Sequence, residues 1–285
     1  MRIFMTGATG YIGSAVAAEL RQRGHEVAAL VRPDSETGAL RDRGVVIVAG
    51  DLADLPSLGD TLAGYDAFIH TAQAHSDATV ALDRGAIDAF TSHDAFVLYT
   101  SGVWVLGNTF DAVADESSPV NPLSLVAWRP AHEEAVLRSG KNAVLRPGCV
   151  YGGKQSLLAD WFAAADRDEP IRIVGDGKNR WAMVHLEELA ELYAMIVEQR
   201  VAGILHGIDD TRDSLELCAQ TLSDSIEYTP ADEVRPKFGP FVDALIVDQQ
   251  ISSEATREKV GWTPRRTFTN SVDAQWAEWR RAGRG

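Results

Sequence analysis

The sequence has few cysteines, no long apolar run and a deficit of positive charge. Its only cysteines, Cys149 and Cys218, cannot form a disulfide framework, and no ligand-spaced Cys/His cluster indicates a metal site. No apolar run reaches the roughly 18 residues of a membrane-spanning helix. The N-terminal MRIFMTGATGYIG meets glycine too early for a signal-peptide apolar region. These absences predict a cytoplasmic, reduced protein with no bound metal.

The charge balance is strongly acidic. Lys and Arg number 27 against 41 Asp and Glu, which gives a formal net charge of −14. A negative field of this size repels phosphate backbones and anionic lipid headgroups, so we expect no nucleic-acid partner and no membrane role. The 45% of hydrophobic residues is typical of a folded globular protein. We therefore expect a small-molecule substrate as the partner.

The first half of the chain alternates β-rich runs with helical segments. Strands are expected at 2–6, 25–31, 44–50, 66–72, 94–102 and 142–148, and helices at 11–24, 54–64 and 78–90. The strands are apolar without alternation, which is typical of a parallel sheet covered on both faces. The predicted fold class is therefore α/β, with a Rossmann-type doubly wound parallel sheet and a smaller C-terminal substrate lobe.

The pattern of elements loosens in the second half. We expect residues 1–150 to form a dinucleotide-binding Rossmann core, and residues 151–285 to form mainly a substrate-binding lobe packed on it as one unit. Short strands are expected at 171–174, 181–184 and 204–208, and a helix at 185–199. The proline-containing segment 229–240 is expected to be a loop.

Glycines after the first strand indicate a dinucleotide site. Gly7, Gly10 and Gly13 form GxxGxxG between a strand and a helix. Glycine there permits a tight turn and close backbone approach to a pyrophosphate, and the helix N-terminus supplies N–H donors. The same spacing also occurs in purely structural turns. Its place between a clear strand and a clear helix favours cofactor binding.

The end of the second strand bears on the choice of cofactor. An acid there binds the ribose 2′-hydroxyl of NAD, whereas an arginine suits the 2′-phosphate of NADP. Here the strand ends in Val31-Arg32. We therefore expect NADP(H) in preference to NAD(H). The nearby Asp34 and a merely solvated role for Arg32 are the alternatives.

Further motifs follow the glycine turn in order. They are GDL at 50–52, HTAQ at 70–73, YTS at 99–101, LRPG at 145–148, VYG at 150–152, GDGKNRWAMVHLEELA at 175–190 and GWTP at 261–264. With TGATGYIG, they resemble the extended, epimerase-like branch of the short-chain dehydrogenase/reductase superfamily over essentially the whole chain. The resemblance implies these cofactor-binding residues: Gly7, Thr9, Gly10, Tyr11, Ile12, Gly13, Arg32, Asp51, Leu52, Thr71, Ala72, Gln73, Thr100, His132, Pro147, Gly148 and Val150.

The chain departs from this family at the catalytic centre. Members usually carry a Ser/Thr with a Tyr and a Lys spaced as YxxxK; the Tyr exchanges a proton, and the Lys holds the ribose and lowers the pKa of the Tyr. Aligned through EEAVL at 133–137, the Tyr position is Trp128 and the Lys position is His132. The hydroxyl position falls on Gly102, with Ser101 one residue earlier. The usual proton-transfer residues are therefore replaced.

The replacements predict a different way of handling the proton. An indole N–H is no practical acid, whereas an imidazole with a pKa of about 6.5 transfers protons well. Pro130 predicts either a helix start or a kink, so stacking of the two side chains one turn apart is not guaranteed. The predicted catalytic residues are Ser101, Trp128, His132 and Tyr151. Trp128 would form a wall of the substrate pocket; the alternatives are a surface Trp128 and a merely structural His132.

The segment that begins GDG bears on the substrate. Sugar-nucleotide members often place an arginine seven positions into it, and here that position is Trp181, preceded by Arg180. We predict an atypical short-chain dehydrogenase/reductase that uses NADPH to reduce a carbonyl, imine or activated double bond in a small organic substrate. The alternatives are a sugar-nucleotide-type epimerase or dehydratase, and a non-catalytic NADP(H)-binding sensor. Relatives often dimerise through helices near the catalytic one, so a homodimer is a further expectation.

Overall fold

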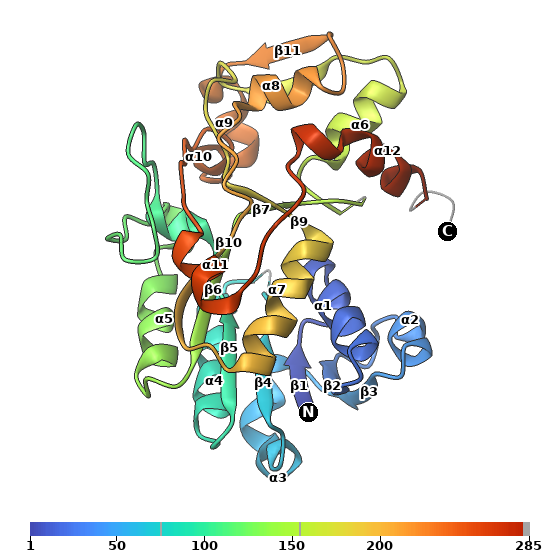
Figure 1. Cartoon of the computed structure of the whole chain (residues 1–285), viewed down its shortest axis with the longest axis vertical. Coiled ribbons are helices and arrows are strands. Elements are labelled where there is room, and N and C mark those ends of the chain that lie inside the picture. The colour runs from blue at the N-terminus through green and yellow to red at the C-terminus, as the bar shows by residue number, and fades with distance from the viewer. Residues whose placement is uncertain (75, 154, 282–285) are drawn as a thin grey trace. The chain divides into compact units, whose positions relative to one another are not determined.

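The computed structural model describes residues 1–74, 76–153 and 155–281 (Figure 1). The chain forms two compact units, and each is discontinuous in sequence. The first contains Met1–Ser101, Trp128–Arg146 and Leu189–Leu205; the second contains Gly102–Ala127, Pro147–Glu188 and the chain from His206. Within the described ranges, no helix has the length and apolar character needed to cross a membrane. A substrate-binding role for the second half stays a prediction.

The main sheet has seven strands. In spatial order they are β10 (Gly203–Gly207), β6 (Ala143–Pro147), β5 (Phe96–Thr100), β4 (Ala67–His70), β1 (Arg2–Thr6), β2 (Glu26–Val31) and β3 (Val46–Ala49). Neighbouring strands from β6 to β3 pair in parallel. The chain order reverses at β1, which lies between β4 and β2, and ligands of such sheets bind at the carboxyl ends of the strands beside this point. The predicted Rossmann-type α/β class is confirmed.

Helices accompany the main sheet on both faces. They are α1 (Tyr11–Gln22), α2 (Gly38–Asp42), η1 (Leu52–Leu58), α3 (Gly59–Leu62), α4 (Thr79–Thr91), α5 (Arg129–Leu137) and α7 (Leu186–Gln199). Phe4, Phe68 and Val97 share a hydrophobic cluster with residues of α4 and α5. The alternate strand residues Ile3 and Ile69 are fully buried too. Burial of both faces explains why these strands lack polar alternation.

A buried ion pair fixes α5 against β6. Arg146 donates from Nε and Nη2 to the carboxylate of Glu133 at 3.1 and 2.6 Å. Both side chains are buried. A bidentate pair of this kind adds geometric specificity to the packing, so it holds the helix that carries His132 in a defined register on the sheet.

The second unit has its own strands, helices and core. Its strands are β7 (Cys149–Tyr151), which pairs in parallel with β9 (Met183–His185), and β8 (Ile171–Val174), which pairs in parallel with β11 (Ile226–Thr229). Its helices are η2 (Val103–Leu106), η3 (Ser124–Val126), α6 (Ala159–Asp166), α8 (Leu215–Gln220), α9 (Ala231–Phe238), α10 (Phe241–Leu245), α11 (Glu254–Val260), η4 (Thr269–Ser271) and α12 (Val272–Arg281). One cluster of buried residues contains Tyr151, Trp161, Trp181 and Phe268.

The loop expected at 229–240 is wrong, because most of this segment forms α9. Pro236 lies inside the helix, which ends where Gly239 adopts a φ of 55°. The first turn carries Asp232 and Glu233, and the last turn carries Arg235 and Lys237. Charges in this order complement the helix dipole and offset part of the cost of an interior proline.

Candidate functional site

The glycine-rich turn after β1 contacts the segment after β4. Gly7 has a φ of 78°, and a Cβ added to it would lie 2.5 Å from the backbone N of Ala72. A Cβ on Gly13 would lie 2.1 Å from the carbonyl oxygen of Gly7. The hydroxyl of Thr71 donates to the carbonyl of Thr6 at 2.8 Å. The structure therefore brings together the predicted cofactor residues of these two segments, and only glycine fits the close approach.

The N-terminus of α1 follows this turn and has no side-chain cap. Gly10 is the N-cap residue, it is exposed, and the first turn holds no acidic residue. The first-turn N–H groups and the positive end of the dipole suit an anion. The predicted cofactor residues Thr9, Tyr11 and Ile12 lie at this end of the helix. The turn and the helix terminus therefore fit the pyrophosphate of a dinucleotide.

Arg32 lies directly after β2 and beside the end of β3. The N–H of Gly50 donates to the carbonyl of Val31 at 3.0 Å, which joins the two strand ends. Arg32 is exposed, and its guanidinium has no hydrogen bond or ion pair within the described part of the chain. Its position is consistent with a contact to a ribose phosphate, and that contact stays a prediction.

Asp51 has a structural role at the start of η1. Its carboxylate accepts from the N–H of Ala53 at 3.3 Å, and its own N–H donates to Asp54 at 2.7 Å. Leu52 is the first residue of η1. These reciprocal bonds form a capping box that fixes the chain after β3. The adenine contact predicted for Asp51 and Leu52 is not tested by this geometry.

Arg129 is a buried cation that the sequence analysis did not single out. Its Nη1 donates to the carbonyl of Thr100 at 2.8 Å, and its Nη2 donates to Oε1 of Gln73 at 3.1 Å. Its guanidinium lies over the indole of Trp128, 4.7 Å from the ring centroid. The hydroxyls of Thr100 and Tyr193 lie 2.6 Å apart. Arg129 thus joins two predicted cofactor residues and places a fixed positive charge between the ends of β4 and β5.

Trp128 and His132 lie one helical turn apart and are in contact. The helix α5 begins at Arg129, so Pro130 occupies the first turn, where no backbone donor is needed. Trp128 is the N-cap residue but has helical dihedral angles, with φ −80° and ψ −23°. Its ring centroid therefore lies 4.9 Å from that of His132, with an interplanar angle of 66°. Pro130 therefore lies in the first turn of the helix and does not separate the two side chains.

Asp83 of α4 is the centre of a buried polar network. Its Oδ2 lies 2.6 Å from Nδ1 of His132 and accepts from the hydroxyl of Tyr99 at 2.9 Å. Nε2 of His70 lies 3.3 Å from its Oδ1. Burial alone would raise the pKa of Asp83, but the contacts with His70 and His132 and the charge of Arg129 hold it below the ordinary value. Asp83 is therefore an ionised, buried carboxylate.

Charged residues on the buried faces of α4 and α5 are the feature of the sequence that indicates this network, and the motifs do not include it. On α4, Asp83 shares the buried face with Ile87 and Phe90, where helical periodicity calls for apolar residues. On α5, Arg129 and His132 also lie on the buried face. Charged residues at apolar positions of two helices are expected to be paired when buried. Which residues pair is a matter of tertiary structure.

Ser101 follows β5 directly. Its N–H donates to the carbonyl of Leu145 at 2.8 Å, which fixes the end of the strand. Its hydroxyl is buried and, among the described residues, has no hydrogen-bond partner. A buried hydroxyl without a partner is unfavourable and needs an explanation, of which a functional role is one. The catalytic role of Ser101 stays a prediction.

Pro147, Gly148 and Val150 belong to the second unit. The N–H of Gly148 donates to the carbonyl of Gly207 at 3.0 Å, and a Cβ on Gly148 would lie 2.5 Å from the carbonyl oxygen of Ala182. Val150 pairs with a residue of β9. These contacts give Gly148 a packing role within this unit. Contacts of the three residues with a cofactor stay predictions.

Tyr151 is fully buried in the second unit. Its hydroxyl donates to Oδ2 of Asp209 at 3.4 Å, and its ring meets His185 and Phe268 edge-on. Burial, followed by the charge of Asp209, raises the pKa of Tyr151 well above its ordinary value. Tyr151 is thus a core residue of this unit, and its predicted catalytic role is not tested.

Asp209 is expected to make the stability of the protein pH-dependent. Burial raises its pKa to about 7, partly opposed by hydrogen bonds from Thr211. Because the folded state then holds a proton that the unfolded state loses near pH 4, stability should fall as pH rises from about 4 to 7. Asp209→Asn should remove this slope. Thermal unfolding across that range measures it, with exposed Asp176→Asn as the control that keeps the wild-type slope. Parallel curves for Asp209→Asn and wild type would contradict the assignment.

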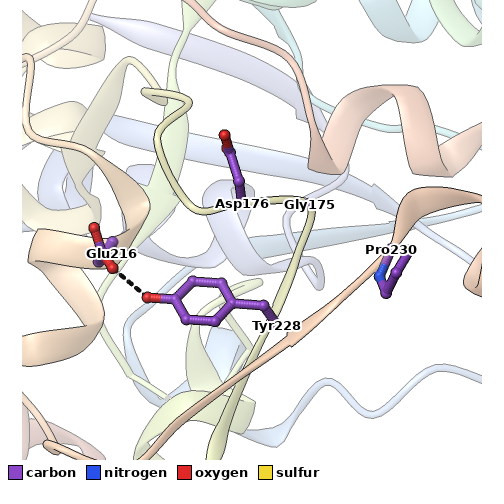
Figure 2. A pocket seen from close by; sticks show the side chains of 5 residues that line it. All are labelled: Gly175, Asp176, Glu216, Tyr228 and Pro230. Carbon is purple, nitrogen blue, oxygen red and sulfur yellow. Dashed lines mark hydrogen bonds between the residues drawn. The ribbon is translucent and has the colours of Figure 1, made fainter.

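A pocket of about 460 Å³ lies in the second unit. Figure 2 shows its lining, which is Gly175, Asp176, Glu216, Tyr228 and Pro230, with the hydroxyl of Tyr228 donating to Glu216. Two carboxylates in the lining disfavour an anionic ligand. The pocket is therefore poorly suited to the phosphates of a nucleotide.

Arg180 forms an ion pair with Asp248 within the second unit. Its Nε and Nη2 donate to the two carboxylate oxygens of Asp248 at 2.8 and 2.5 Å, and Nη2 also donates to the carbonyl of Phe110. Trp181 next to it is buried. A bidentate partner occupies the guanidinium edge that would bind a diphosphate. Arg180 is therefore held by contacts within the protein, and the small organic substrate stays a prediction.

Comparison with known proteins agrees with this geometry. A family model described as NAD(P)H-binding matches residues 7–142. The chain is 28% identical to protein YLL056C of Saccharomyces cerevisiae, over 93% of this chain and 95% of that protein. It is 26% identical to 2-alkyl-3-oxoalkanoate reductase of Stenotrophomonas maltophilia, over 71% of this chain and 67% of the relative. The structure of human epimerase family protein SDR39U1 with NADPH matches it with a TM-score of 0.80 at 18% identity, covering 97% and 99% of the two chains.

The fold, the glycine turn and the family model define an NAD(P)H-binding α/β protein. More narrowly, its homologues at 26–28% identity include a named reductase and an epimerase family protein, which are NAD(P)-binding proteins of the short-chain dehydrogenase/reductase and epimerase type. The family resemblance inferred from the motifs is confirmed. The replacement of the family's Tyr–Lys pair by Trp128 and His132, and the preference for NADP(H), stay predictions.

Proposed function

We propose that the protein is an NADPH-dependent reductase of a carbonyl, imine or activated double bond in a small organic substrate. The observation that carries this proposal is the group of Trp128, Arg129 and His132 at the start of α5, beside the carboxyl ends of the strands. It combines an aromatic wall, a fixed cation and a proton-transfer side chain. A relative of this chain is named 2-alkyl-3-oxoalkanoate reductase, which supports the same class of reaction.

Each side chain of this group has a part in the proposed reaction. When bound, NADPH supplies a hydride to the carbon that is reduced. Arg129 holds a positive charge at the strand ends, where it stabilises negative charge that develops on the substrate oxygen. His132 supplies the proton that this oxygen needs. The start of the reaction does not require removal of a hydroxyl proton, the step for which a Tyr–Lys pair is best suited.

The proposal is tested by following NADPH absorbance with a panel of small ketones, 3-oxo acids, imines and enones. Turnover of at least one class, with a kcat that falls in His132→Ala, is the expected result. Tight NADPH binding without turnover of any panel compound contradicts the proposed reaction and favours a cofactor-binding sensor. Exchange of substrate stereochemistry without net NADPH consumption would favour an epimerase.

Arg32→Ala is expected to weaken binding of NADPH much more than binding of NADH. The guanidinium has no protein partner among the described residues, so its removal should cost the fold little. A lost charge-assisted contact with the 2′-phosphate corresponds to about 1.5–3 kcal/mol, or roughly 10- to 150-fold in Kd. Fluorescence titration with each nucleotide measures both constants, and Arg41→Ala, another exposed arginine, is the control. Equal effects on the two nucleotides would contradict the role of Arg32 in cofactor choice.

A further inference from the structure

The contact between Asp83 and His132 links two helices. Both side chains are buried, with about the same small exposure of 5%, and Oδ2 of Asp83 lies 2.6 Å from Nδ1 of His132. An ionised carboxylate has lone pairs but no proton to give. Nδ1 of His132 must therefore be the donor in this bond. Nε2, the other ring nitrogen, has no hydrogen bond to any residue that the structure describes.

The other groups that face Asp83 leave this arrangement intact. Tyr99 donates its hydroxyl proton to Oδ2. Burial, helped by Asp83 and opposed by the charge of Arg129, raises the pKa of Tyr99 well above its ordinary value, so it stays protonated. Nε2 of His70 points at Oδ1 from 3.3 Å, while its Nδ1 lies 2.6 Å from the hydroxyl of Thr6. No group of three potential ligands in the described ranges is arranged to hold a metal ion. Nε2 of His70 has no hydrogen-bond partner among the described residues but faces the carboxylate of Asp83, whereas in His132 it is Nδ1 that faces Asp83 and Nε2 is left for another partner.

We propose that Asp83 is a positioning residue that fixes the tautomer and orientation of His132, so that Nε2 delivers the proton in the reduction. This inference rests on the reductase function proposed above. As a hydride reaches the carbonyl carbon, the C=O π pair moves to the oxygen, and the proton on Nε2 of the imidazolium bonds to that oxygen. The ring is left neutral with its remaining proton on Nδ1, held by Asp83, and water returns a proton to Nε2.

Asp83→Asn is the direct test of the positioning role. Without the negative partner, the imidazolium is disfavoured and both tautomers of the ring become accessible. We expect kcat to fall about 100-fold, the lower end of general acid contributions, while the Kd for NADPH stays within about twofold. A loss of NADPH affinity in step with the fall in kcat would indicate a merely structural role and overturn the proposal.

A double-variant cycle separates the dyad from general damage. Asp83→Asn combined with His132→Ala should be no slower than His132→Ala alone, because two residues that act as a unit are not additive. Asp88→Asn is the matched control, since Asp88 is an exposed carboxylate on the same helix that pairs with Arg84. It should leave kcat and the Kd for NADPH unchanged. Additive losses in the double variant contradict a shared role.

The tautomer of His132 can also be determined by a measurement that does not depend on enzymatic activity. In the wild-type protein labelled with ¹⁵N-histidine, NMR should show the neutral His132 ring protonated at Nδ1, and Asp83→Asn should shift its population towards the Nε2–H form. A neutral wild-type ring protonated at Nε2 would overturn the proposal. This measurement separates failure of the proposed reaction from failure of the proposed role of Asp83. An inactive protein with the Nδ1–H tautomer contradicts the reaction but supports the contact between Asp83 and His132. An active protein with the Nε2–H tautomer supports the reaction but contradicts the role of Asp83.

Discussion

Gly10→Val should abolish binding of NADP(H) while the fold persists. A Cβ at Gly10 would meet one atom within 4 Å, the carbonyl oxygen of Gly7 at 3.2 Å, so a small adjustment accommodates it. The branched side chain would then stand at the uncapped N-terminus of α1, where the pyrophosphate needs close approach to the backbone. We expect the Kd to rise at least 100-fold, about 2.7 kcal/mol.

Gly13→Ala is the matched contrast in the same turn. Its Cβ would lie 2.1 Å from the carbonyl oxygen of Gly7 and 2.7 Å from the hydroxyl oxygen of Thr71, distances that no relaxation of a single side chain can relieve. We expect a loss of about 3 kcal/mol in the free energy of unfolding without cofactor, because the turn must move away from the segment after β4. Urea unfolding and nucleotide titration of both variants measure the difference. Retained NADPH affinity in a folded Gly10→Val protein would contradict this site.

The sequence predicts the first unit well because its signals are local. Strands buried on both faces appear as apolar runs, and the observed strands β1 to β6 lie within the predicted ranges. Glycines that must adopt positive φ or allow close approach are visible in the sequence itself, as at Gly7 and Gly13. The segment 54–64 differs: Pro56 lies within the tighter η1, and only the short α3 follows. Pro56 thus lies in a 3-10 helix, whereas Pro236 lies inside the α-helix α9.

The candidate site is harder to predict from the sequence, because the partners of its central residue, Asp83, lie far from it in the chain. Asp83 and His132 are 49 positions apart, and their bond depends on how α4 and α5 pack. Trp128 and His132 occupy the positions of the family's YxxxK motif. Asp83 and Arg129 belong to none of the family motifs named above. In the sequence they stand out only as charged residues on the buried face of a helix. This pattern predicts a buried polar network but does not show which residues pair in it.

The charge balance of this network leads to the second large effect, that of Arg129→Met. Arg129 contacts the hydroxyl of Tyr99 at 3.3 Å, and Tyr99 in turn donates to Asp83, so the buried cation and the buried anion are linked through one hydroxyl. Methionine keeps much of the apolar stem but removes the charge, which takes one stabilising charge away from Asp83 and leaves the carbonyl of Thr100 and the amide oxygen of Gln73 without their donor. Losing these buried interactions should lower the free energy of unfolding by about 3 kcal/mol. The exposed Arg84, paired with Asp88, is the control, and Arg84→Met should cost less than about 1 kcal/mol.

The double variant Arg129→Met with Asp83→Asn decides whether the two charges are coupled. Because the charge of Arg129 acts on Asp83 only while Asp83 is an anion, the double variant should be more stable than the sum of the single effects predicts, by about 1.5 kcal/mol or more. Urea unfolding of the four proteins gives this coupling free energy directly. Additive losses would show that Arg129 stabilises the protein through Thr100 and Gln73 alone, and that Asp83 remains ionised through its other contacts. A large coupling would instead mean that the cation which contacts the two predicted cofactor residues also keeps Asp83 charged beside His132.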